Sequence, residues 1–264
     1  MRRNIPYTIC DNNQLQRLDA TSIPSLTVRG NDSLWKYSID NNSTHFLYAK
    51  FPKNKNFEHK ETLNELYGNI IAESLEVSYR PVSAMKTVDG FYIASEISLD
   101  YNTTLNYKKS QGTPLFISND TKVSDFILRL FTCDTDSNDQ SILVHQNNTN
   151  TSRIDFAYCF GYNGNEYQLI ALNSLGPVQP GPYFNEIKQY DFKTIITSEI
   201  VQKIITLNIL ELDNKFVKVI DEICRSFWPD KRDELLEIKN KIILPMLEFR
   251  KSEIINIIKE QLKK

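Results

Sequence analysis

The sequence has 264 residues, of which 41% are hydrophobic and 24% are charged, proportions typical of a folded globular protein. Its 31 basic and 33 acidic residues nearly balance, giving a formal charge of −2, whereas a nucleic-acid platform normally carries a strong basic excess. No run approaches the roughly 18 consecutive apolar residues of a membrane-spanning helix. We therefore expect neither direct nucleic-acid binding nor a membrane span.

The N-terminus and the cysteines indicate a cytoplasmic protein. No apolar stretch follows Arg2 and Arg3, so the pattern of a secretory signal is missing. The four cysteines are widely spaced and form no CxxC pair, which argues against a zinc knuckle and a disulfide framework and predicts reduced, mostly buried thiols. These residues are Cys10, Cys133, Cys159 and Cys224.

The first hundred residues are expected to form strands around one helix. Between two of the strands, apolar residues recur at three- and four-residue steps from about 60 to 75, which predicts an amphipathic helix. Polar turn clusters separate the early strands, and Asp89-Gly90 predicts a hairpin turn between the last two. The predicted strands are 26–28, 34–39, 45–51, 82–85 and 91–97.

The remaining residues are predicted to be mostly helical. Helical periodicity dominates from 194 to the end, with a break at 227–230 and a kink or interruption at Pro245. Before that, residues 99–120 are expected to be a polar connector and 161–182 an irregular segment rich in Gly and Pro. The other predicted elements are a helix at 123–131 and strands at 141–145 and 153–156.

This order of elements predicts an α+β protein. We expect a strand-rich N-terminal lobe at 1–98 and a helical C-terminal lobe at 99–264, which together form one domain.

Phosphoryl transfer needs a loop over the phosphates, a cation, carboxylates for a metal and a group that orients the nucleophile. The loop candidates are Gly30, Asn31 and Ser33, whose backbone N–H groups and hydroxyl could reach a phosphate, although such a cluster alone is commonly a plain turn. The cation candidate is Lys50, near the end of a predicted strand. Glu65 on the following helix would hold its ammonium group, with Glu61 and Glu73 as alternatives.

Two acidic motifs supply the metal and nucleophile candidates. Asp134, Asp136 and Asp139 lie within six positions, where like charges repel unless they are solvated or share a cation. Asp155 follows a short β-branched stretch, and burying it there costs free energy unless it has a partner such as Mg²⁺. The 19 positions from Asp136 to Asp155 fit a loop, two strands and a hairpin, so both carboxylates could meet in one cleft.

The order of these motifs resembles the HipA-like kinases, bacterial relatives of the protein kinases and phosphatidylinositol kinases. The resemblance covers most of the chain from about residue 26 and implies a bilobal protein-kinase-like fold. It also implies Ser/Thr protein kinase activity with ATP and Mg²⁺. The segments that carry it are Lys50, the helix at 64–75 with Glu65, Asp136 with Ser-Ile-Leu-Val at 141–144, Ile-Asp155-Phe, and the stretches 223–229, 235–236 and 247–251.

By this resemblance, Lys50 would contact the phosphates, Glu65 would hold it and Asp136 would be the catalytic base. Asp155 would bind Mg²⁺, while Glu96 and Ile97 would read adenine through their backbone groups.

The chain departs from the family at the second metal position. Family members commonly have Asn five positions after the base, whereas this chain has Ser141, and a serine hydroxyl is a poorer ligand. Gln140 and Asp139 beside it are the other metal-ligand candidates. Alternatively, Asp134 is the base, which puts Asp139 at the metal position.

Three functions therefore stay open: an active protein kinase, a nucleotide-binding pseudokinase that acts as an interaction module, and a lipid or small-molecule kinase. For the last, basic residues of the C-terminal helix would face an anionic membrane surface, although a solvated face over a core stripe is the plainer explanation. The expected partners are a protein substrate and a regulatory partner such as an antitoxin. Delivery into a host cell is the alternative to a cytoplasmic location.

Overall fold

The computed structural model describes residues 15–19, 32–40, 43–51, 58–87, 90–96, 101–103, 117–136, 142–145, 151–153, 155–168, 181 and 183–263. Its strands are β1 (Leu15–Leu18), β2 (Ser33–Asp40), β3 (Ser43–Lys50), β4 (Val82–Thr87), β5 (Gly90–Glu96), β6 (Tyr101–Thr103), β7 (Ile142–His145) and β8 (Thr151–Arg153). Its helices are α1 (Glu58–Ser74), α3 (Asn119–Thr132), α4 (Phe184–Ile187), α5 (Phe192–Ile196), α6 (Glu199–Thr206), α7 (Ile209–Ser226), η3 (Pro229–Lys231), α8 (Arg232–Ile238), η4 (Lys239–Ile243) and α9 (Leu244–Leu262).

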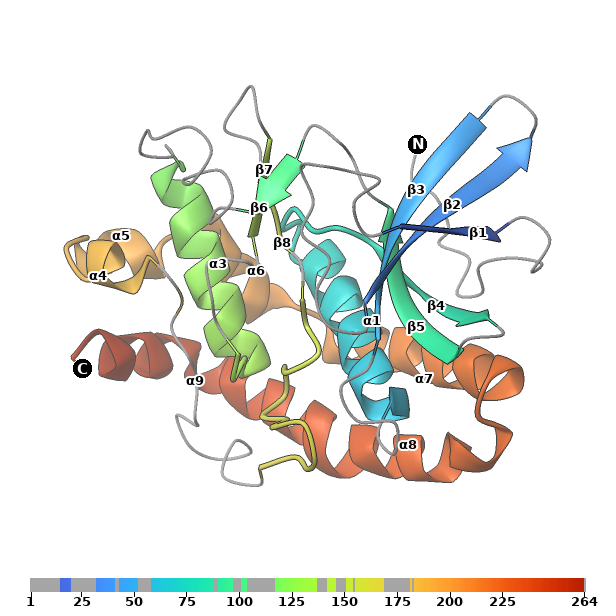
Figure 1. Cartoon of the computed structure of the whole chain (residues 1–264). Helices are drawn as coiled ribbons and strands as arrows, with labels where there is room; N and C mark the ends of the chain where they lie inside the picture. The colour runs from blue at the N-terminus through green and yellow to red at the C-terminus, as the bar shows by residue number, and fades with distance from the viewer. Residues whose placement is uncertain are drawn as a thin grey trace.

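The N-terminal strands form an antiparallel five-stranded sheet in the order β1-β2-β3-β5-β4 (Figure 1). Side chains alternate between its two faces, as the period of a strand requires. On one face, Trp35, Leu47 and Tyr92 belong to a small separate core. On the other, Phe91 and Ile93 belong to the large core shared with the helices. Both faces of the sheet are therefore packed.

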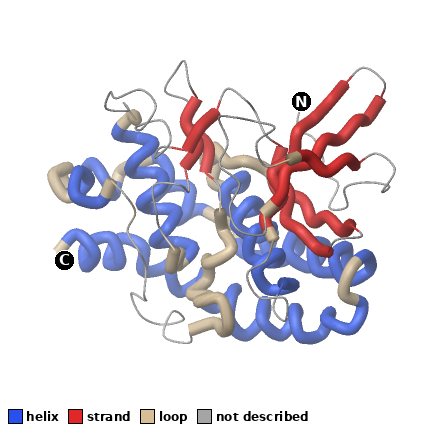
Figure 2. The backbone as a smooth tube through the Cα atoms, in the orientation of Figure 1, coloured by secondary structure: helices blue, strands red, loops and turns tan. Residues whose placement is uncertain are grey.

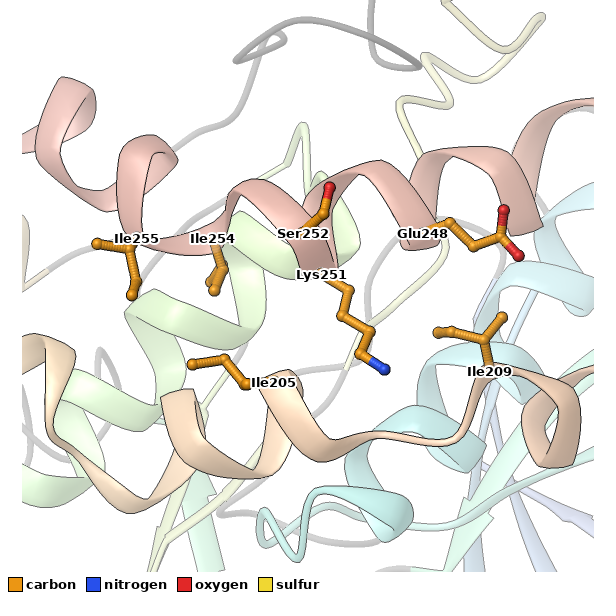
Figure 3. Close-up of a pocket in the computed structure, with 7 residues that line it drawn as sticks. All are labelled: Ile205, Ile209, Glu248, Lys251, Ser252, Ile254 and Ile255. Carbon is orange, nitrogen blue, oxygen red and sulfur yellow. The ribbon is translucent and has the colours of Figure 1, made fainter.

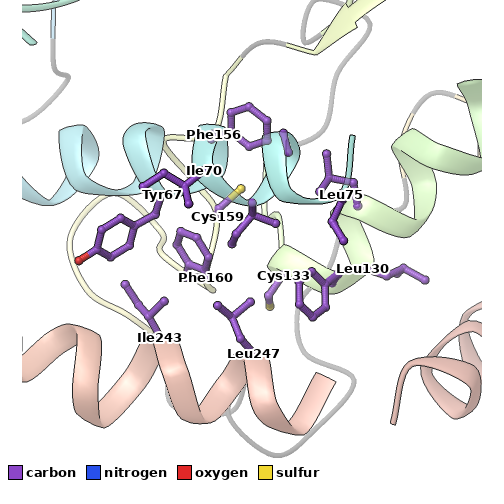
Figure 4. Close-up of a cluster of buried hydrophobic side chains, with 14 of the residues drawn as sticks. Tyr67, Ile70, Leu75, Leu130, Cys133, Phe156, Cys159, Phe160, Ile243 and Leu247 are labelled. Carbon is purple, nitrogen blue, oxygen red and sulfur yellow. The ribbon is translucent and has the colours of Figure 1, made fainter. Parts of the chain in front are cut away.

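Helix α1 lies in the middle of the molecule, in contact with β4 and α7 (Figure 1). It buries 13 of its 17 residues, because the sheet and the C-terminal helices cover it on several sides. Tyr67 stacks on Phe216 of α7 with ring centroids 3.8 Å apart. Figure 4 shows Tyr67 beside Phe160, with Leu247 of α9 on the other side of the cluster. Although α1 belongs to the predicted N-terminal lobe at 1–98, it thus packs against both the sheet and the helices of the C-terminal lobe.

The regular structure of the rest of the described chain is a second, three-stranded antiparallel sheet (β6-β7-β8) and the helices from α3 to α9, with loops between them (Figure 2). Helix α3 begins after Ser118, whose hydroxyl accepts a hydrogen bond from the Thr121 N–H. In the C-terminal part, the π-helical turn η4 ends at Ile243, two positions before Pro245 in the first turn of α9. Proline lacks an N–H and clashes with the carbonyl four residues earlier, and a π-helical turn accommodates such a mismatch.

The expected α+β class, with an antiparallel sheet first and helices at the C-terminal end, is confirmed. The break at 227–230 and the interruption at Pro245 are also confirmed. Cys133, Cys159 and Cys224 are free and buried as expected, while Cys10 lies outside the described residues. Among the described helices, none combines the length and apolar character that crossing a membrane requires.

Two local predictions were wrong, and one strand was not predicted. The segment at 99–120 is more than a connector, because it holds β6 and the first two residues of α3. β8 covers 151–153 instead of 153–156, and Asp155 has a positive φ of 70°, which a strand does not allow. β1 was not predicted, since Leu-Gln-Arg-Leu shows no clear alternation. The predicted strand at 26–28 lies outside the described residues.

The buried His59 near the start of α1 makes the contact with α8 sensitive to pH. Its Nε2 lies 3.2 Å from Glu234 Oε1, with Lys60 and Lys231 also bonded to Glu234. Burial lowers the pKa of His59, although the Glu234 carboxylate opposes this shift. Below about pH 6.5 the unfolded chain therefore takes up this proton more readily than the folded one, and stability falls. Lowering the pH from about 7.5 to about 5.5 should therefore lower the Tm of the wild type more than the Tm of His59→Gln, as measured by thermal melts. Equal losses of Tm would contradict this prediction.

Candidate active site

Lys50, the last residue of β3, joins helix α1 to the segment after β8. Its Nζ donates to Glu65 Oε1 at 2.7 Å and to Asp155 Oδ1 at 2.8 Å. The Glu65 side chain is 1% exposed, whereas those of Lys50 and Asp155 are both 32% exposed. A ligand from solvent can therefore reach the ammonium group and the Asp155 carboxylate, while Glu65 supports them from inside.

Glu65 also connects α1 to the backbone beside Asp155. Its second oxygen, Oε2, accepts a hydrogen bond from the Phe156 N–H at 2.9 Å. The neighbouring Asn64 donates to the Ala157 carbonyl at 2.9 Å and accepts from the Tyr167 hydroxyl at 2.8 Å. Two successive residues of a buried helix thus fix the segment that carries Asp155.

The charges in this cluster keep Lys50 protonated. Burial lowers the pKa of Lys50, but the carboxylates of Asp155 and Glu65 outweigh it and raise that pKa above its ordinary value. Burial raises the pKa of Glu65, against the opposing effect of Lys50. With both carboxylates ionised, one ammonium faces two negative charges, and such surroundings favour a further cation at the partly exposed Asp155.

Asp155 occupies an uncommon backbone conformation. Its φ of 70° lies in the left-handed region, which non-glycine residues rarely adopt, although Asp tolerates it better than most. Arg153 Nη2 donates to the Asp155 carbonyl at 3.3 Å, so a hydrogen bond stabilises this conformation directly. Strained backbone of this kind is concentrated at functional sites, where the surrounding structure maintains it.

The two candidates for the catalytic base differ in their surroundings. Asp134 is 1% exposed, and its Oδ2 accepts hydrogen bonds from Arg129 and Arg153. Burial raises the pKa of Asp134, although both guanidinium groups oppose the shift. Asp136 is only partly buried, and its backbone N–H donates to Asp134 Oδ1 at 3.0 Å. These surroundings favour Asp136 over Asp134 as a group that could meet a substrate.

The remaining predicted site residues are only partly covered by the structure. The Ser33 hydroxyl is buried and accepts a hydrogen bond from Trp35 Nε1 at 2.6 Å, and Glu96 is exposed at the end of β5. In the part of the chain that the structure describes, no group of three or more His, Cys, Asp or Glu residues could hold a metal ion. The candidates that lie outside the described residues are Gly30, Asn31, Ile97, Asp139, Gln140 and Ser141.

Residues to which the sequence analysis gave no role of their own also belong to this region. Asp32 accepts hydrogen bonds from the Phe51 N–H at 2.9 Å and the Tyr48 hydroxyl at 2.7 Å, which fixes the end of β3 beside Lys50. Arg129 and Arg153 bind Asp134. The Arg-Ile-Asp sequence that places Arg153 two positions before Asp155 was the available signal.

A separate cavity of about 550 Å³ lies between α6 and α9 (Figure 3). Its lining is largely isoleucine, including Ile205 and Ile255. Lys251 also lines it and donates to the Leu207 carbonyl at 2.6 Å. None of its lining residues belongs to the cluster of Lys50, Glu65 and Asp155, so the cavity and the candidate active site are distinct.

The chain was compared with protein families, curated proteins and solved structures. No family model matches the chain, and no curated protein matches it. The chain is similar to the crystal structure of a Helicobacter pylori proinflammatory kinase, CtkA, with a TM-score of 0.48 and 14% identity, over 85% of this chain and 95% of that one. Such a likeness says nothing about the roles of residues, which rest on the contacts described above.

Proposed function

We propose that this chain is an ATP-dependent phosphotransferase of the protein-kinase type, HipA-like in its motifs, that transfers the γ-phosphate to a Ser or Thr hydroxyl of a protein. The observation that carries the proposal is the position of Lys50 between Glu65 and Asp155. A strand lysine held by a helix glutamate, beside an aspartate from a later loop, is the arrangement with which kinases bind and align ATP.

Each residue has a defined part in this proposal. The Lys50 ammonium binds phosphate oxygens, and Glu65 keeps it in position from the buried side. Asp136 orients the acceptor hydroxyl and accepts its proton. Asp155 offers a partly exposed carboxylate, which is the hard oxygen ligand that Mg²⁺ prefers. When bound, Mg²⁺ would neutralise charge on the phosphates.

The test is phosphate transfer from labelled ATP with Mg²⁺, to the chain itself and to a panel of proteins. We expect transfer by the wild type and a loss of about 10²-fold for Asp155→Asn and Asp136→Asn, because each removes a charge needed in the transition state. Asp221→Asn is the matched control, since Asp221 pairs with Arg232 on the helical part. It should keep wild-type activity.

The other outcomes separate the alternatives. A thermal shift with ATP but no transfer, unchanged by Asp136→Asn, would indicate a pseudokinase that acts as an interaction module. Labelling of phosphoinositide vesicles in preference to proteins would indicate a lipid kinase. Absence of both ATP binding and transfer would overturn the proposal. A regulatory partner such as an antitoxin and a cytoplasmic location stay predictions from the sequence.

A further inference from the structure

Four buried charged residues form a closed ring between α3 and β8, here called the ion ring: Asp125, Arg129, Asp134 and Arg153. Arg129 donates to Asp125 at 2.7 Å and to Asp134 at 2.9 Å. Arg153 donates to Asp125 at 3.0 Å and also to Asp134. Each arginine thus binds both carboxylates, and the two positive and two negative charges cancel.

The ion ring contacts the backbone at both acidic positions of the candidate site. Asp134 Oδ1 accepts the Asp136 N–H at 3.0 Å. Arg153 Nη2 donates to the Asp155 carbonyl at 3.3 Å, and its guanidinium lies 5.4 Å from the centroid of the Phe156 ring. The same pair of side chains therefore sets the backbone from which the Asp136 and Asp155 carboxylates extend.

Stability alone does not explain such a ring. A buried ion pair contributes little net stability, because removing its charges from water costs about as much as their attraction returns. What it does supply is geometry, since a guanidinium fork bound to two carboxylates fixes directions as well as distances. Here the ring holds the backbone of two loops, at residues 136 and 155, which are 19 positions apart in sequence.

We infer that Asp134 and Arg153 are positioning residues that set the separation of Asp136 and Asp155 in the phosphotransferase site, an inference that rests on the proposed function. Arg129 and Asp125 complete the ring, but none of their described side-chain hydrogen bonds reaches residue 136 or 155. Arg129 therefore serves as the matched control for Arg153.

The test compares Arg153→Lys with Arg129→Lys. Both substitutions keep the charge and remove the fork from an equally buried arginine, so a merely structural ring would make them equivalent. We expect Arg153→Lys to lower kcat about 10-fold to 100-fold more than Arg129→Lys, with KM for ATP unchanged. Amide hydrogen exchange provides a readout independent of activity: peptides spanning 134–136 and 155–160 should exchange faster in Arg153→Lys than in Arg129→Lys.

Equal losses of kcat and equal exchange in the two variants would overturn the inference, as would a rise in KM with unchanged kcat. If Arg153→Lys fails to fold, the double variant D134N/R153Q replaces it, because it removes one charge of each sign and keeps the ring neutral. Its peptides spanning 134–136 and 155–160 should also exchange faster than those of Arg129→Lys. If the wild type neither binds ATP nor transfers phosphate, the proposed function fails, and the exchange comparison still decides whether Arg153 positions these loops.

Discussion

Replacing Lys50 with methionine should reduce phosphate transfer by about 10²- to 10³-fold, the cost of removing one charged group from a transition-state site. Methionine is nearly as long as lysine and fills the same space, so the change removes the ammonium and little else. The ammonium is the link that Glu65 and Asp155 share, at 2.7 Å and 2.8 Å. We expect the loss in kcat/KM for Mg-ATP, measured by initial rates with labelled ATP.

Stability must be measured alongside, because the substitution leaves Glu65 buried without its cation. Burial already raises the pKa of Glu65, so in Lys50→Met this carboxyl should take up a proton and avoid an unpaired charge. Lys86→Met is the matched control: it makes the same change at an exposed lysine of the same sheet. It should keep wild-type transfer. Activity of Lys50→Met close to wild type would contradict the proposed role of the cluster.

The parts of the fold and site that could be predicted are those with local signals. The periodicity at 60–75 predicted α1, and Lys50 followed by Glu65 on that helix predicted their contact, which the ion pair bears out. The contact between Asp155 and Lys50 was not predicted: the resemblance gave Lys50 to the phosphates and Asp155 to Mg²⁺, and the structure pairs the two side chains directly. The start of α3 had an overlooked signal, since Ser118 before Asn-Asp-Thr is a good N-cap.

The rest depends on contacts that no local pattern contains. The sequence left Asp134 open as an alternative to Asp136. Only the folded chain brings Arg129 and Arg153, which lie 24 positions apart, to the Asp134 carboxylate. The left-handed backbone of Asp155 likewise results from hydrogen bonds on both sides of it, from Arg153 and to Glu65. Predicting a strand there was reasonable from Ile-Asp-Phe, and tertiary contacts overrode that propensity.

Gly68 in the interior of α1 packs closely against Phe156. Glycine in a helix interior costs about 1 kcal/mol relative to alanine. The same Gly→Ala change at an exposed helix position would therefore stabilise a protein. Here a Cβ would lie 2.3 Å from Cγ, 2.4 Å from Cβ and 2.5 Å from Cδ1 of Phe156. Those atoms are close to the Phe156 backbone, so relieving the overlap must move the residue directly after Asp155.

Gly68→Ala should therefore destabilise the chain by about 1–3 kcal/mol, as overpacking a core does, and lower phosphate transfer about 10²-fold through the displaced Asp155. Denaturant titration measures the first effect, and initial rates under folded conditions measure the second. The cause can be isolated with a double-mutant cycle: the destabilisation should shrink in a Phe156→Ala background, because two of the three overlaps are with ring atoms. If Gly68→Ala instead raised Tm, as on an exposed helix, the close packing of α1 against the Asp155 segment would be refuted.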